Sequence, residues 1–362
     1  MKKNMIALAV AGALVAPVAM AEVTVSGGLQ AELVQIGGDG LGADTGLYAA
    51  DGFEVGKENG GNFGFLKFSA SEDLGGGLKA LAMYNMNTHV GDESNAVGTR
   101  DAYVGLSGSL GTVLAGTLST PYKTSTVAYD PFLMTSFQAR GSYGMSALHN
   151  GYVGNALAYA NGFAGGMVKV VAALVLDEGA DQGVPPDATK TNGKHAKSLS
   201  VNIAPMSGLD IAVAYIDVSE FSDASKLGVG APAGAVGKDA SATKVGAKFS
   251  NAAFSVAGQV EMLNEGLTAS GDKGNVVYLT GSFNVNEANS ISVSVGQSDA
   301  NVISTPAEVA AGTDDGASYA ALGFKHAFSK STSMTVGYRA SEDKRGDGNK
   351  ETAIGAGLRV AF

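Results

Sequence analysis

The sequence predicts an all-β protein, an antiparallel barrel of sixteen strands that spans a membrane. Three observations lead to this prediction. Apolar and polar residues alternate along most of the chain, short and long connections take turns, and the N-terminus has the features of an export signal.

The alternation has the period of two that strands require, because successive side chains point to opposite faces of a sheet. Clear examples are Ile291–Val295, Met334–Ala340, Ser198–Ile203 and Val245–Phe249. No stretch after residue 21 has convincing helical periodicity. The mature chain should therefore consist almost entirely of strands.

The connections between these strands fall into two classes. Short ones include Asn284–Asn289 and Ser329–Thr332, whereas the long ones are polar and rich in Gly; the first spans 37–61 and the third 119–150. Seven short and eight long connections in strict alternation leave sixteen strands. Outer-membrane barrels are built this way, with short periplasmic turns and long extracellular loops. A soluble all-β sandwich is the alternative, but it would not sort its connections so regularly.

The first residues predict export from the cytoplasm. Lys2 and Lys3 precede an apolar run, Met5–Ala16, and Ala19–Ala21 supplies the small residues of a cleavage site. We therefore expect residues 1–21 to be a cleaved signal peptide and residues 22–362 to form one barrel domain. Later apolar runs such as 170–176 are far shorter than the roughly 20 residues of a membrane helix.

The composition excludes several classes of function. The chain has no Cys, so it has no disulfide or thiol chemistry, and its net charge of −10 argues against general nucleic-acid binding. The four His residues are scattered over loops and turns, and no strand places a Ser–His pair clearly. We expect no enzymatic activity, no cofactor and no metal. A sixteen-stranded barrel is too wide for side chains to fill, so the polar face should point inward to water.

Several segments resemble the Gram-negative general-diffusion porins of the neisserial and burkholderial type. Phe68–Ala80 is similar to their second strand, first turn and third strand, and Thr99–Tyr122 to their fourth and fifth strands. Asn155–Gly166 resembles the sixth strand and its turn, and Phe328–Thr332 the last periplasmic turn. The terminal Phe362 matches the aromatic residue that ends the family's last strand.

This resemblance implies a homotrimeric channel in the outer membrane, surrounded by lipid and lipopolysaccharide, through which small hydrophilic solutes and ions diffuse passively. The third loop, 119–150, would fold into the barrel and narrow the pore. Phe362 would be recognised by the barrel-assembly machinery. The loop departs from the commonest family pattern because Asp130 is its only carboxylate.

A channel needs fixed charges that face water in a narrow place. Strand parity predicts an inward position for most of the charged candidates, and Arg100 is carried over from the family's fourth strand. The basic candidates are Lys79, Arg100, Lys169, Lys244, Lys248, Arg339 and Arg359. The acidic candidates are Glu32, Asp210 and Glu261, and the third loop adds Lys123, Asp130 and Arg140. This basic balance predicts a weak anion preference or none.

Two other functions stay open at this stage. A solute-specific porin would need a binding track along the lumen, which the sequence alone does not place. A surface adhesin or phage receptor could use the same barrel as a scaffold, and conductance in a lipid bilayer separates this possibility from a channel.

Overall fold

A computed structural model describes the strands, the short turns and parts of the long connections. The described residues are 21–38, 46–50, 64–88, 98–139, 144–148, 152–176, 195–219, 221, 239–268, 271–303, 316–343 and 349–362. Residues 1–20, and with them most of the predicted signal peptide, lie outside this range, so its cleavage stays a prediction.

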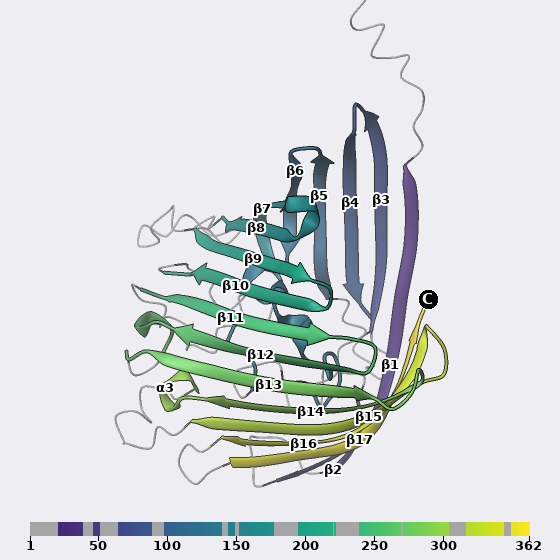
Figure 1. The fold of residues 1–362 in the computed structure, drawn as a ribbon, viewed down its shortest axis with the longest axis vertical. Coiled ribbons are helices and arrows are strands. Elements are labelled where there is room, and N and C mark those ends of the chain that lie inside the picture. Colours follow the sequence, from purple (N-terminus) through teal and green to yellow (C-terminus); the bar gives the residue numbers. More distant parts are fainter. Residues whose placement is uncertain are drawn as a thin grey trace, which may run out of the picture.

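One antiparallel sheet contains all the strands, and Figure 1 shows β8 to β17 side by side in chain order. The first seven strands are β1 (Glu22–Gly38), β2 (Gly46–Ala50), β3 (Phe65–Gly75), β4 (Leu78–Asn87), β5 (Thr99–Gly108), β6 (Gly111–Leu118) and β7 (Val153–Phe163). The others are β8 (Val168–Val175), β9 (Ala196–Met206), β10 (Leu209–Asp217), β11 (Ser241–Ser250), β12 (Phe254–Leu263), β13 (Gly274–Asn284), β14 (Asn289–Ser298), β15 (Ala317–Ala327), β16 (Thr332–Asp343) and β17 (Asn349–Ala361).

The sheet closes on itself at β1, which pairs with β17 along one edge. Its other edge is shared by β2, which pairs with 32–36, and by β3, which pairs with 22–28. These two strands occupy one position in the wall, so the barrel has the predicted sixteen positions. The prediction of an uninterrupted first loop over 37–61 is wrong, because β2 lies within it and extends the wall.

The connections alternate as the sequence predicted. The turn between β3 and β4 is tight because Gly76 and Gly77 adopt positive φ angles of 62° and 79°. Strand β3 continues to Gly75, the first glycine of this turn. The chain ends of the barrel, Glu22 and Ala361, lie on the side of the short turns.

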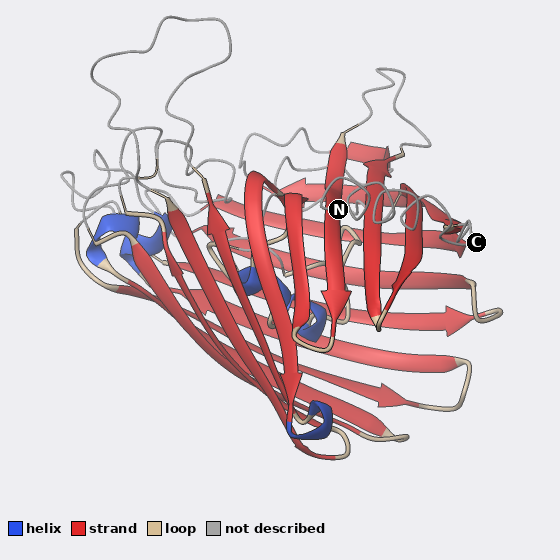
Figure 2. Ribbon diagram, turned by 90° about the horizontal axis from the view of Figure 1, so that it is seen from above, coloured by secondary structure: helices blue, strands red, loops and turns tan. Residues whose placement is uncertain are grey.

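Within the described residues, helical structure is limited to short segments: α2 (Pro121–Thr124), η1 (Val127–Tyr129), η2 (Ala164–Gly166), η4 (Glu265–Leu267) and α3 (Ala300–Ile303). None of the described helices is long and apolar enough to cross a membrane. Figure 2 shows the wall curving around helical turns that lie inside it. Because α2 contacts β8, β9 and β10, it packs on the inner face of the barrel.

The outer face is apolar, as the strand pattern predicted. Val104 and Leu279, for example, are 63% and 54% exposed, which suits a surface that meets lipid. The expectation of a polar inner face is only partly correct. Two buried apolar clusters lie there, one around Tyr122 and Leu148 and one around Phe132 and Phe137, because residues of the third loop cover the wall.

Candidate functional site

The loop between β6 and β7 folds into the barrel interior. It leaves β6 at Ser119, whose N–H donates to the Asp101 carboxylate of β5 at 3.0 Å. Thr120 then caps α2 by accepting a hydrogen bond from the Lys123 N–H, and Pro121 fits the first turn because it has no N–H to satisfy. These local signals turn the chain inward and start its course along the wall.

Glycines of the wall provide seats for aromatic side chains of the loop. A Cβ at Gly246, Gly323 or Gly337 would come within 3.0 Å of Tyr129, Phe132 or Phe137. Real Cβ atoms do not approach this closely, so the loop can lie flat on β11, β15 and β16 only because these wall positions lack side chains. Glycines in the wall and aromatic residues in the loop therefore complement each other in shape.

The first polar anchor of the loop lies at the closure of the barrel. Glu32 of β1 accepts hydrogen bonds from the N–H of Ser136, at 2.8 Å, and from its hydroxyl. Arg359 of β17 donates to the carbonyls of Leu133 and Met134 at 3.2 and 3.0 Å. Both Glu32 and Arg359 thus hold loop backbone, and Glu32 is almost fully buried.

The second anchor lies on β11 and β12. Glu261 accepts from the Tyr122 hydroxyl at 2.8 Å, from the Ser146 hydroxyl, and from the Ala147 N–H at 2.7 Å. Its cross-strand neighbour Lys244 donates to the Tyr122 carbonyl at 2.7 Å. Burial and the nearby Glu261 carboxylate raise the pKa of Tyr122 well above its usual value, so the phenol remains a donor at neutral pH.

Asp130 shapes the loop from within. One oxygen accepts from the Phe132 N–H at 2.9 Å and from the Tyr278 hydroxyl at 3.2 Å, and the other accepts from the Ala139 N–H at 2.7 Å. Its charge is therefore met by donors at short range. Glu32, Glu261 and Asp130 all stabilise the position of the loop, and all three are buried.

Several basic candidates are also engaged. Arg339, 2% exposed, forms an ion pair with Glu351 of β17, a partner that the sequence analysis missed. Lys248 donates to the Ala128 carbonyl at 3.2 Å. Lys123 lies over the Tyr152 ring at 4.2 Å and is buried, so it is part of the packing of the loop.

Arg100 owes its position to a bulge. Tyr84 pairs with Ala102 and Met86 pairs with Thr99, so two residues of β5, at 100 and 101, lie opposite one of β4. The bulge breaks the simple parity of the strand, which explains why parity alone did not place Arg100. Its guanidinium is buried and donates to the Gly64 carbonyl at 3.2 Å and to Asn87.

Three further predicted residues face inward and do not contact the described part of the third loop through a hydrogen bond. Lys79 and Lys169 are exposed on the inner face of β4 and β8, and Asp210 on β10 is held by the Asn202 amide at 3.0 and 3.1 Å. Arg140 lies outside the described residues. Two further lysines, Lys67 and Lys325, share this face and were missed, although parity with the outward Phe68 and Phe324 would have found them.

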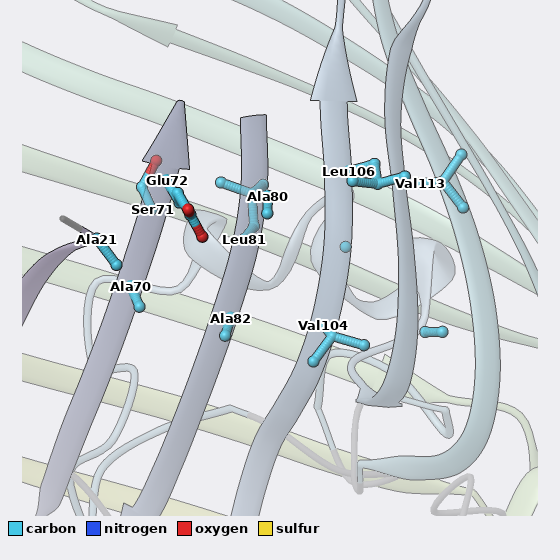
Figure 3. Close-up of a pocket in the computed structure, with 12 residues that line it drawn as sticks. Ala21, Ala70, Ser71, Glu72, Ala80, Leu81, Ala82, Val104, Leu106 and Val113 are labelled. Atoms are coloured by element: carbon cyan, nitrogen blue, oxygen red, sulfur yellow. The ribbon is translucent and has the colours of Figure 1, made fainter. Parts of the chain in front are cut away.

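The outer face has one distinctive region, across β3 to β6. Small residues there form a shallow apolar groove; Figure 3 shows Ala70 and Ala82 on neighbouring strands with Val104 beside them, and Leu106 and Val113 complete the edge. An adjoining hollow reaches Val23, Phe68 and Tyr84. Elsewhere the outer face carries larger side chains such as Leu279, Phe283 and Leu322.

Phe362 lies at the closure of the barrel. Its N–H and carbonyl pair with the carbonyl and N–H of Gly27 at 2.9 and 2.8 Å. The ring is 66% exposed and lies next to Gly27, where a Cβ would clash with it. The terminal residue thus completes the last strand and also presents an aromatic surface.

Comparisons with known proteins agree with this architecture. A family model described as Gram-negative porin matches residues 7–346. The major outer membrane protein P.IB of Neisseria gonorrhoeae is 35% identical over 130 residues, which is 34% of either chain. The P.IA protein of Neisseria meningitidis serogroup C is 38% identical over 69 residues, 19% of this chain and 18% of that protein. The matched segments thus span about a third or less of these relatives.

Solved structures share the fold over nearly the whole chain. An anion-selective porin from Comamonas acidovorans superposes with a TM-score of 0.70 at 18% identity, covering 95% of this chain and 100% of that one. OmpF of Salmonella typhi, in complex with daunomycin, gives 0.64 at 15% identity with the same coverage. The resemblance predicted from the sequence is confirmed by the family match over residues 7–346, and the chain belongs to the Gram-negative porin family.

Proposed function

We propose that the protein forms a water-filled channel through which small hydrophilic solutes and ions diffuse passively across the outer membrane. The observation that carries the proposal is the loop held inside a closed barrel by anchors at Glu32 and Glu261. A loop held in this way would narrow the passage, and passive transport requires no catalytic group, cofactor or metal. The loop between residues 119 and 150 is the proposed constriction.

Planar-bilayer recording of the purified protein tests this function. Stepwise increases in conductance are expected, and sugars above a limiting size should be excluded in liposome-swelling assays. A protein that inserts into bilayers without conducting would instead favour an adhesin or phage receptor built on the barrel. Saturation by one solute only would favour a solute-specific porin.

The proposed pore lining comprises the inward charged residues, with Lys67, Lys79, Lys169 and Lys325 exposed or half-buried among them. Glu261 and Asp130 are buried and accept hydrogen bonds through both oxygens, and buried Glu32 accepts two through one oxygen, so these carboxylates contribute little to the electric field in the passage. This arrangement supports weak anion preference. The reversal potential across a salt gradient measures it, and strong cation selectivity would contradict it.

We propose that the protein is a homotrimer, with the groove across β3 to β6 as the contact between subunits. Small residues such as Ala70 and Ala82 allow neighbouring walls to approach closely in lipid. An oligomeric band that becomes monomeric on boiling is expected on denaturing gels. Ala82→Phe should weaken the oligomer, whereas Leu279→Phe on the opposite side of the outer face should not.

The signal peptide and assembly partners complete the proposal. Cleavage after Ala21 would leave Glu22, the first residue of β1, at the N-terminus, which mass spectrometry of the mature protein tests. Deletion of Phe362 should sharply lower outer-membrane insertion by removing the aromatic residue offered to the assembly machinery. Equal insertion of the truncated chain would contradict this role. The outer face would contact lipid, and the rim of long loops lipopolysaccharide.

A further inference from the structure

The inner face of β4 to β8 carries two rows of mostly apolar residues that a purely water-filled passage does not need. One row across the strands, matched by register, is Leu81, Gly105, Leu114, Ala158 and Ala173. The next row toward the long loops contains Met83, Tyr103, Gly116, Ala156 and Val175. Two of these ten residues are glycines, and apart from the Tyr103 hydroxyl the other eight side chains contain no nitrogen or oxygen.

Some of these side chains are buried under the third loop and others are partly exposed in the barrel interior. Ala156, Ala158 and Val175 are buried under the third loop, in the cluster with Tyr122 and Leu148. Leu81, Met83, Tyr103, Leu114 and Ala173 are only half-buried, and we call these five the apolar field. Three of them, Tyr103, Leu114 and Ala173, also pack against the buried cluster, so Leu81 and Met83 are its members outside that packing. Leaving apolar area in water costs about 25 cal/mol per Å², so a solute that covers it gains free energy.

Lysines surround the apolar field. Lys79 lies two residues from Leu81 on the same face, and Lys169 lies four from Ala173. Residues two apart on one face of a strand are about 7 Å apart, so Leu81 is within reach of Lys79, whereas four residues, the separation of Lys169 from Ala173, span about 13 Å. Lys67 of β3 pairs with Asn85, the inward neighbour of Met83. The side chains of these three lysines form no ion pair and no hydrogen bond with any other described residue.

Three carboxylates lie on or near this wall, and each of them accepts a hydrogen bond; Asp73 is also the cross-strand neighbour of Lys79. Asp73 accepts the Gly75 N–H at 2.8 Å in the tight turn, and Asp101 accepts the Ser119 N–H at 3.0 Å. Asp210 on β10 is held by Asn202. The wall thus offers apolar contact together with positive charge, which complements a solute that has a carboxylate at one end and a hydrocarbon part at the other.

We propose that the apolar field and its three lysines form a binding site for small amphipathic anions, such as short-chain carboxylates. The proposal rests on the channel function and names the solute class that this wall favours. The apolar chain of the solute would lie on Leu81, Met83 and Leu114. Its carboxylate would be held by Lys79 or Lys169 toward the short turns, or by Lys67 toward the long loops.

A homologous series measures the site directly in the purified protein in planar bilayers. Acetate, butyrate and hexanoate carry the same charge and differ only in length. We expect the concentration that half-blocks chloride current to fall about two- to fourfold for each added CH₂, since a buried methylene contributes about fourfold. Alkylammonium ions of equal length should block far less. Conductance with no dependence on chain length would overturn the site while leaving the channel intact, whereas no conductance would overturn both.

Two kinds of variant separate the apolar and charged parts. Met83→Gln keeps the side-chain size and should flatten the dependence on chain length, and Leu81→Ser combined with Leu114→Ser should flatten it further. Lys79→Gln with Lys169→Gln should raise all half-blocking concentrations by a similar factor and keep the slope. Thr335→Ala, on the inner face of β16, is the matched control and should change neither. An unchanged slope in Met83→Gln, or an equal change in Thr335→Ala, would overturn the assignment.

Discussion

The two sides of the barrel interior are built differently. On the anchored wall, β11 to β17 with β1, charged side chains such as Glu32, Glu261 and Arg359 are used to hold the third loop. On the open wall, β3 to β8, the third loop covers only part of β7 and β8, and Lys79 and Lys169 remain exposed next to half-buried apolar residues. Inward charged residues therefore either hold the third loop or remain exposed in the interior. Their burial distinguishes these two groups, whereas strand parity does not.

The difference teaches that the charges closest to the loop need not control ion flow. A buried carboxylate surrounded by N–H and O–H donors has its field compensated locally. An exposed lysine is screened by mobile ions only beyond about 8 Å at physiological salt, a distance comparable with a narrow passage. Structural stability should thus depend on the anchored wall, and solute preference on the open wall.

Replacement of Glu261 by Ala should have the largest effect. It removes the acceptor for Tyr122, Ser146 and Ala147 and leaves Lys244 buried without its neighbouring carboxylate. Breaking a buried pair in this way costs about 3–5 kcal/mol. We expect a lower unfolding temperature in detergent and a larger, noisier single-channel conductance.

The matched control is Glu342→Ala. Glu342 pairs with Lys350 at 3.4 Å at the exposed edge of the barrel, where a salt bridge contributes about 0–1 kcal/mol. If both variants conduct alike, Glu261 does not hold the loop.

Tyr122→Phe removes a single donor from the same anchor. A hydrogen bond to a charged group contributes about 1.5–3 kcal/mol, so the unfolding temperature should fall less than in Glu261→Ala. The folded protein raises the pKa of this phenol, so its stabilisation is complete below the unfolded value of about 10 and is lost as pH rises through the folded pKa.

The stability difference between wild type and Tyr122→Phe should therefore be constant from pH 7 to about 10 and shrink above it. Tyr215→Phe on the outer face serves as the control. A difference that already disappears near neutral pH would show that the phenol is not the donor.

Gly337→Ala tests the aromatic seat on the anchored wall. The added Cβ would lie under 3.0 Å from the Phe137 ring, so the loop or the strand must shift, at a cost of about 1–3 kcal/mol. Gly281→Ala is the control, because its Cβ would have no neighbour closer than the Ser255 carbonyl at 3.9 Å. The unfolding temperature and the conductance of both variants are measured. A larger effect of Gly281→Ala would contradict the claim that Gly337 makes room for the Phe137 ring.

The sequence predicted the strands and their faces because alternation is a local property. Lys79, Lys169 and Glu261 were placed on the inner face from parity with their neighbours, and the structure puts them there. Arg100 was carried over from the family resemblance and not from parity, and parity could not have placed it, because a bulge depends on the partner strand as well as on β5 itself. It also did not suggest Glu351 as the partner of Arg339.

What the sequence could not supply was the course of the third loop. Val34, Ile36 and Ala242 point inward although they are apolar, which contradicts a simple polar lumen. The last of these is covered by the cluster around Tyr122 and Leu148. The seats at Gly246, Gly323 and Gly337 likewise look like ordinary strand glycines until the loop is in place.

The smallest expected effect concerns ion preference on the open wall. Lys169→Gln removes an exposed inward charge and should shift the reversal potential across a salt gradient by a few millivolts toward cations. Lys197→Gln is the control, since Lys197 is exposed on the outward side of β9, near the long-loop end. Arg339→Gln together with Glu351→Gln removes a buried pair with no net charge and should shift the potential less than Lys169→Gln. A larger shift from the double variant would mean that ions pass along the anchored wall, and that the third loop does not shield it.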